Sequence, residues 1–124
     1  MNPVKTVLVV DDDPDLTEIM CNRVAQAGYS ILKAKNGKEG LEVALAKHPD
    51  LILLDVMMPE VSGLDMLKSL RNDPWGKQAH IFMLTSVNRS KEMTESMNYN
   101  VDKYIIKADI DYQKLVADIK QYLQ

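Results

Sequence analysis

The sequence predicts an α/β protein in which helices cover both faces of a parallel β-sheet. Residues 6–10 and 51–54 are short, wholly apolar segments, as is typical of strands buried on both faces. Between such segments, apolar residues recur at the three- and four-residue spacing of an amphipathic helix. Strands and helices therefore alternate along the chain, and this alternation favours a parallel sheet joined by right-handed helical crossovers.

Size and composition predict one globular domain over residues 1–124. Apolar residues make up 46% and charged residues 27% of the chain, a balance that excludes a disordered protein. The net charge of −3 gives no reason to expect direct binding to nucleic acid or to an anionic membrane. No apolar run is as long as a membrane span and no signal-peptide core precedes the first strand, so we expect a cytoplasmic protein.

Five strands, each followed by a helix, are expected along the chain. The strands are residues 6–10, 29–35, 51–55, 79–84 and 101–106, and segment 29–35, which alternates and carries two lysines, is expected at a sheet edge. Asp13 is the expected cap of the first helix, and Asp109 or Asp111 that of the last. The helices are one from Pro14 to a stop at Gly28, one marked by Leu41, Ala44 and Leu45, one marked by Leu64, Leu67 and Leu70, one over 90–100 with Met93 and Met97 as its apolar side, and one marked by Leu115, Ile119 and Leu123.

Polar side chains stand where four of the expected strands end. In open parallel sheets the functional crevice lies at the carboxyl ends of the strands. Three carboxylates, a hydroxyl and an ammonium are therefore expected to meet at one edge of the sheet. They are Asp11 and Asp12 after the first strand, Asp55 at the end of the third, Thr85 with Ser86 after the fourth, and Lys107 after the fifth.

This set of side chains favours a magnesium site over other acidic sites. Carboxylates at 4 Å repel one another by about 4 kcal/mol for each pair at an effective dielectric near 20. A divalent cation together with Lys107 would neutralise them, and few acidic ligands with room for water suit Mg²⁺. Residues 11–15 lack the glycine and the final glutamate of a calcium-binding EF-hand loop. The three aspartates at 11–13 would also repel a flavin phosphate.

Phosphoryl transfer is the chemistry that such a site could support. A lysine, a hydroxyl and Mg²⁺ would neutralise and orient the phosphoryl oxygens beside a free carboxylate. Asp55 would then be the nucleophile, and the product would be an aspartyl phosphate.

Four segments resemble the receiver domain of two-component response regulators, in the single-domain form of the chemotaxis regulators. They are Val-Val-Asp-Asp-Asp at 9–13, Leu-Asp-Val-Met-Met-Pro at 54–59 with Gly63, Met-Leu-Thr-Ser at 83–86 and Tyr-Ile-Ile-Lys at 104–107. The resemblance covers essentially the whole chain. It implies a doubly wound (βα)5 flavodoxin-like fold, with a five-stranded parallel sheet in the order 2-1-3-4-5 and helices on both faces.

The resemblance also implies a role for each residue of the site. Asp55 matches the phosphorylated aspartate, Thr85 the switch hydroxyl and Lys107 the phosphate-binding lysine. Tyr104 matches the aromatic switch residue, whose side chain turns inward when Thr85 moves toward the phosphoryl group. The implied magnesium ligands are Asp12, Asp55 and the backbone carbonyl of Met57, with Asp11 holding a metal-bound water.

Four positions qualify what the resemblance implies. Ala108 follows Lys107 where the family usually has a proline after a cis peptide bond, and a trans bond here would put the reach of Lys107 in doubt. Asn100 replaces a glycine before the last strand, and asparagine tolerates the left-handed conformation. Met57 and Val87 place no polar group near the site to orient an attacking water, so we expect slow self-dephosphorylation.

The expected function is that of a phosphoacceptor signalling domain and not of an enzyme, although it would assist its own phosphorylation and dephosphorylation. The implied donor is a sensor histidine kinase or a histidine phosphotransfer protein. A downstream protein would bind the face formed by the fourth helix, fifth strand and fifth helix, and a phosphorylation-linked homodimer stays open. We expect no output domain, because the chain ends after its fifth helix.

Two other functions stay open at this point. A receiver-like interaction module that has lost its chemistry is supported by Ala108 alone. A Mg²⁺-dependent phosphatase with an aspartyl-phosphate intermediate, of the haloacid dehalogenase type, would carry its nucleophile on the first strand. Here the candidate nucleophile is on the third strand, and no segment is long enough to form a cap domain.

Overall fold

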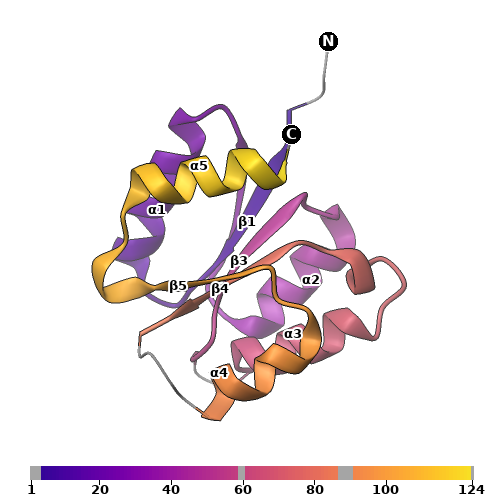
Figure 1. The fold of residues 1–124 in the computed structure, drawn as a ribbon. Coiled ribbons are helices and arrows are strands. Elements are labelled where there is room, and N and C mark those ends of the chain that lie inside the picture. The colour runs from indigo at the N-terminus through magenta and orange to yellow at the C-terminus, as the bar shows by residue number, and fades with distance from the viewer. Residues whose placement is uncertain (1–3, 59–60, 87–90, 124) are drawn as a thin grey trace.

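Five parallel strands form one sheet in the order β2-β1-β3-β4-β5, as the resemblance implied (Figure 1). The computed structural model describes residues 4–58, 61–86 and 91–123. Segment 29–35 was expected at a sheet edge, and β2 does lie at one. The last two strands each begin two residues later than the sequence predicts. The strands are β1 (Thr6–Val10), β2 (Ser30–Ala34), β3 (Leu51–Asp55), β4 (Ile81–Thr85) and β5 (Lys103–Ile106).

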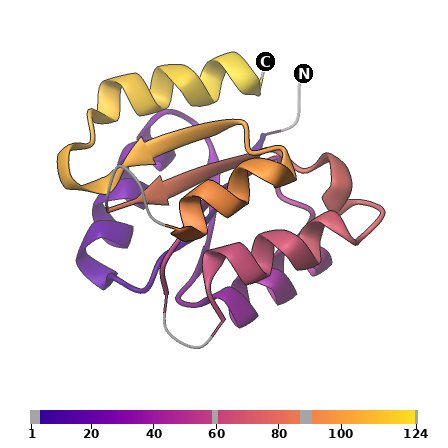
Figure 2. The same cartoon turned by 60° about the horizontal axis from the view of Figure 1, so that its bottom comes forward.

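Helices cover both faces of the sheet, α1 and α5 on one and α2, α3 and α4 on the other (Figures 1 and 2). Asp13 caps α1 as predicted, and of the two expected caps of the last helix it is Asp111 that accepts the backbone N–H of Lys114. No helix in the described part of the chain is long and apolar enough to cross a membrane. The helices are α1 (Pro14–Gln26), α2 (Gly37–Lys47), α3 (Gly63–Arg71), α4 (Lys91–Ser96) and α5 (Tyr112–Tyr122), with the 3₁₀ turns η1 (Gly76–Gln78), η2 (Met97–Tyr99) and η3 (Lys107–Asp109).

The core consists of two apolar layers, one on each face of the sheet. Successive strand residues point to opposite faces, so Val7 and Val9 pack toward α1 and α5 while Leu8 and Val10 pack toward α2 and α3. Residues 51–54 and 81–84 are also fully buried and alternate between the layers in the same way. The central strands therefore hold their carboxyl ends in fixed positions.

The fourth helix differs from its prediction. Met93 and Met97 were expected to form its buried side, but Met97 is 58% exposed and the buried residue of α4 is Ser96. The α-helix ends at Ser96 and continues as the 3₁₀ turn η2, whose tighter winding turns residue 97 away from the core. Leu45, expected on the buried face of α2, is also partly exposed.

Arg71 joins the end of α3 to the chain segment before β5. Its Nε donates to the carbonyl of Tyr99 at 2.7 Å and its Nη2 to that of Asn100 at 2.9 Å. Its Nη1 donates to the carbonyls of Gly76 at 2.6 Å and Ala79 at 2.9 Å. Asn100 has the left-handed conformation that the sequence allowed for, with φ of 57°. One guanidinium thus satisfies four carbonyls, two between α3 and β4 and two between α4 and β5.

Replacing Arg71 by methionine should lower the free energy of unfolding by about 2–4 kcal/mol. The substitution keeps most of the side-chain length but removes the donor of four carbonyls, three of them in partly buried hydrogen bonds. Urea unfolding would measure the loss, with Lys77→Met, an exposed position in η1, as the matched control. A loss no larger than that of the control would show that Arg71 does not hold these loops.

Candidate functional site

Asp11 and Asp55 are placed side by side by the register of the two central strands. Val10 of β1 pairs with Leu54 of β3, so the next residue of each strand is an aspartate at the carboxyl edge. The backbone N–H of Asp11 donates to Ala34 of β2 at 3.1 Å, which holds this residue against the sheet after β1 has ended. Both aspartates are buried, with exposed fractions of 2% and 3%.

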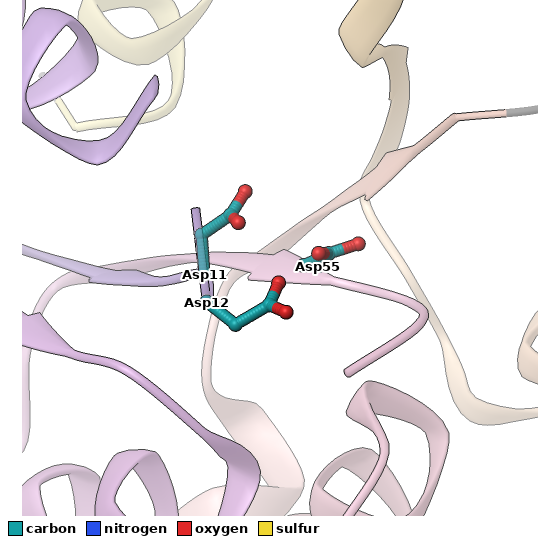
Figure 3. Close-up of side chains that lie close together, drawn as sticks. All are labelled: Asp11, Asp12 and Asp55. Atoms are coloured by element: carbon teal, nitrogen blue, oxygen red, sulfur yellow. The ribbon is translucent and has the colours of Figure 1, made fainter. Parts of the chain in front are cut away.

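Three carboxylates point into one space at this edge, as Figure 3 shows. The cluster contains one carboxylate oxygen from each residue, and these three oxygens lie within 4.8 Å of one another. The residues are Asp11, Asp12 and Asp55. Asp12 is exposed to solvent while the other two are buried. The predicted cluster is therefore present, with one open side.

Lys107 reaches both buried carboxylates. Its Nζ lies 3.0 Å from Asp55 Oδ2, 3.0 Å from Asp11 Oδ2 and 3.3 Å from Asp11 Oδ1. No cis peptide bond occurs among the described residues, so the bond between Lys107 and Ala108 is trans. The doubt that Ala108 raised about the reach of Lys107 is thus removed.

The pKa of the Asp55 carboxyl group is raised to about 6, mainly by burial. The negative charge of Asp11 also raises it, while the hydrogen bond from Lys107 lowers it. Burial lowers the pKa of Lys107, but its bonds to the two carboxylates more than offset this, and the net direction is upward. One ammonium therefore does not fully compensate the buried negative charge at this edge.

The donor set fits a hard divalent cation. Asp11 Oδ2 is buried and accepts no hydrogen bond in the described part of the chain, because Lys107 Nζ, although 3.0 Å away, lies outside hydrogen-bonding geometry. A buried polar atom without a partner costs free energy, and a cation would satisfy it. Carboxylate oxygens with an open side for water are the ligands that Mg²⁺ prefers.

The chain after β3 is held close to the backbone of Asp55. The N–H of Met57 donates to Asp55 Oδ1 at 3.2 Å, and the Met57 side chain is 51% exposed. A Cβ on Gly63 would lie 1.9 Å from the carbonyl oxygen of Asp55, so only glycine fits at this position. Pro59, the last residue of the matching segment 54–59, lies outside the described residues.

Thr85 ends β4 on the neighbouring strand. Leu84 pairs with Asp55, so Thr85 is one residue nearer the carboxyl edge, and it is buried at 3% exposed. Val87, the second of the two positions on which slow dephosphorylation was argued, is not among the residues that the structure describes, and that expectation stays a prediction.

Tyr104 has a partner that the sequence did not single out. Its hydroxyl lies 2.6 Å from Oγ of Ser96, which in turn donates to the carbonyl of Met93 at 2.6 Å. The sequence offered one indication, since Ser96 follows Met93 by three residues and so shares its side of a helix. The pairing with a tyrosine on another element could not be read from that spacing.

The family model of the response regulator receiver domain matches residues 7–120 of this chain. The chain belongs to this family. The receiver domain is 33% identical over 120 residues to the phosphate regulon transcriptional regulatory protein PhoB of Pseudomonas aeruginosa, covering 97% of this chain and 52% of that protein. It is 29% identical to the polar-differentiation response regulator DivK of Brucella ovis, covering 96% of both.

Solved structures agree with the family assignment. The response regulator TrrA of Thermotoga maritima, in complex with Mg²⁺ and BeF, superposes with a TM-score of 0.85 at 32% identity, covering 97% of this chain and all of that one. The receiver domain spans about half the length of several curated relatives that it matches. It is a receiver domain of two-component response regulators, and its pocket of Asp11, Asp12 and Asp55 fits a phosphoacceptor aspartate with Mg²⁺.

Asp55→Asn should stabilise the metal-free receiver domain at pH 7.5 by about 1–3 kcal/mol. The pKa of Asp55 rises from 3.8 to about 6 on folding, so the folded state favours the protonated form. Ionisation of Asp55 therefore lowers the stability as the pH rises from about 4 to above 6. Asparagine removes that penalty while keeping an oxygen for Lys107.

Urea unfolding in the presence of a chelator would measure this difference from pH 4 to pH 8. The gap between Asp55→Asn and the unsubstituted protein should narrow as the pH falls toward 4, because Asp55 becomes protonated in the folded state. Asp109→Asn, at an exposed position, should show no such trend. A gap that is independent of pH would contradict the raised pKa.

Proposed function

We propose that the receiver domain accepts a phosphoryl group on Asp55 from a phosphohistidine of a partner protein. The observation that carries this proposal is a buried aspartate at the end of a central strand, with an ammonium 3.0 Å away and two further carboxylates, one buried and one exposed, beside it. A structural ion pair would need only one carboxylate. The other two carboxylates add negative charge that a bound cation would neutralise, and phosphoryl-transfer sites use such a cation.

Each residue of the site has a distinct role in this reaction. A carboxylate oxygen of Asp55 attacks phosphorus, and the O–P bond forms while the N–P bond of the donor breaks and the imidazole leaves with the electron pair. Lys107 neutralises the charge that builds on the phosphoryl oxygens. Thr85, at the end of the adjacent strand, donates a hydrogen bond to the transferred group.

Mg²⁺ would be held by Asp12, Asp55 and the backbone carbonyl of Met57, with Asp11 binding one of its waters. When bound, it supplies positive charge that attenuates the repulsion between the carboxylates and an incoming phosphoryl group. The complex of TrrA with Mg²⁺ and BeF supports this assignment. The charge also favours the ionised form of Asp55, which is the form that attacks.

The partners are a sensor histidine kinase or a histidine phosphotransfer protein as donor, and a downstream protein that reads the face of α4, β5 and α5. That face carries a groove of about 330 Å³ between β5 and α5, lined in part by Tyr104, Ile106 and Lys114. Ile106 is 46% exposed and offers an apolar contact. Two copies of the receiver domain meeting at this face would form the phosphorylation-linked homodimer.

The reach of Lys107 argues against an interaction module without chemistry. Ala108 was the sequence feature in favour of that alternative, yet Lys107 contacts both carboxylates. No contact of the described residues favours the phosphatase alternative.

Mg²⁺ should raise the melting temperature of the receiver domain in a concentration-dependent way, since it binds the folded site and not the unfolded chain. Asp12→Asn should reduce this shift, because it removes a charged ligand without disturbing the buried pair. Thermal unfolding at several Mg²⁺ concentrations would test this, with Asp109→Asn as the control. Equal shifts for all three proteins would rule out the acidic cluster as the binding site.

Incubation with acetyl phosphate and Mg²⁺ should add one phosphoryl group, visible as one adduct in the intact mass. The adduct should be absent for Asp55→Asn and present for Asp109→Asn, and it should disappear when the metal is chelated. No adduct on the unsubstituted protein in the presence of Mg²⁺ would overturn the proposal and restore the alternative of lost chemistry.

A further inference from the structure

We propose that Ser96 is a positioning residue that fixes Tyr104 to α4, so that α4 and β5 respond to phosphorylation as one unit. The inference rests on the proposed function, because it concerns how the phosphorylated site would reach the partner face. It assigns to Ser96 a role in the switch, and it makes the hydroxyl of Tyr104, as well as its ring, part of the coupling.

The direction of the hydrogen bonds follows from the atoms involved. Ser96 Oγ lies 2.6 Å from the carbonyl oxygen of Met93, which can only accept. The single hydroxyl proton of Ser96 is therefore used there. Tyr104, 2.6 Å from the same Oγ, must donate. The result is a directed chain from the tyrosine hydroxyl through the serine to the backbone of α4.

Burial makes this chain costly to break. Ser96 is fully buried, and the half-buried ring of Tyr104 packs against the apolar layer under α3. If Tyr104 turned away, an oxygen of Ser96 would stay buried with one partner fewer, and such a loss costs about as much as a hydrogen bond. Tyr104 and α4 are thus energetically coupled in the absence of a phosphoryl group.

The carboxyl end of α4 is also anchored to α3. Arg71 donates to the carbonyls of Tyr99, the last residue of η2, and Asn100, and Lys68 of α3 pairs with Glu95. Figure 2 shows α4 beside β5 on the face of the sheet that α3 also covers. Arg71 and Lys68 thus hold the carboxyl end of α4 to α3, and Ser96, at the same end, links the helix to Tyr104 of β5.

The sheet connects this chain to the phosphorylation site. Tyr104 pairs with Met83 of β4, and Ile106 pairs with Thr85 two residues further on. A change at Thr85 therefore acts on the same strand pair that carries Tyr104. Without Ser96, we expect Asp55 to be phosphorylated as before while the helix no longer follows.

A plain buried serine is the competing explanation. Serine within a helix often donates to a backbone carbonyl three or four residues earlier, as Ser96 does to Met93, and the contact with Tyr104 would then have no role of its own. The two explanations differ in whether Ser96 and Tyr104 act through each other.

A double-mutant cycle separates them. Ser96→Ala, Tyr104→Phe and the double variant would be compared by amide hydrogen exchange of residues 91–99, with and without Mg²⁺ and beryllofluoride as the phosphoryl mimic. Each single variant should change the beryllofluoride response of these amides by about two- to tenfold, which corresponds to one net hydrogen bond. The double variant should resemble the single ones, because one interaction has been removed. Ser69→Ala, an exposed serine of α3, is the control.

Additive effects in the cycle, or a response in Ser96→Ala equal to that of the unsubstituted protein, would overturn the inference. Tyr104→Phe tests the same bond without touching Ser96, so the inference stays testable if Ser96→Ala folds poorly. Labelling with acetyl phosphate distinguishes a failure of the proposed function from a failure of the role of Ser96. An unlabelled wild-type protein refutes the proposed function, whereas normal labelling of Ser96→Ala with an unaltered helix response refutes the role of Ser96 alone.

Discussion

The interaction on which the site depends is the sharing of one ammonium by two buried carboxylates. Lys107 lies 3.0 Å from an oxygen of Asp11 and 3.0 Å from an oxygen of Asp55, and both acids are almost completely buried. One positive charge cannot neutralise both, and Asp12 adds a third negative charge. Burial is the main cause of the raised pKa of Asp55, and the charge of Asp11 adds to it. Excess buried negative charge favours the binding of a cation, and the proposed phosphoryl transfer would depend on that cation.

The fully buried central strands make this imbalance tolerable. Every residue of β3 and β4 is buried, so the apolar layers on both faces fix the backbone from which Asp55 and Thr85 project. The close approach of Gly63 to the backbone of Asp55 restricts the chain after β3 in the same way. Because packing and not the charges determines where the carboxylates lie, the repulsion between them persists in the folded state and is available to drive cation binding.

The sequence was sufficient for the parts of the site that depend on strand ends. Asp11, Asp55 and Thr85 follow apolar strands directly, and the rule that parallel strands present their carboxyl ends at one edge places them together. The trans bond before Ala108 and the reach of Lys107 were not accessible in this way, since they depend on the path of the chain through η3. The roles of Ser96 and Arg71 could not be predicted from the sequence for a related reason. Their partners are 8 and up to 29 residues away along the chain, and only the tertiary fold brings them close.

The fourth helix is where a signal can change the structure at least cost. It has six residues, too few to be stable as an isolated helix, and its one buried residue is Ser96. Its position is therefore determined by a few polar contacts: Arg71 after its carboxyl end, Lys68 on its side and Tyr104 through Ser96. Polar contacts of this kind are directional and few, so the position of the helix depends on each of them. Under the proposed function, a change at Thr85, at one end of the β4–β5 pair, would alter the face of α4, β5 and α5 without disturbing the apolar layers that hold Asp55.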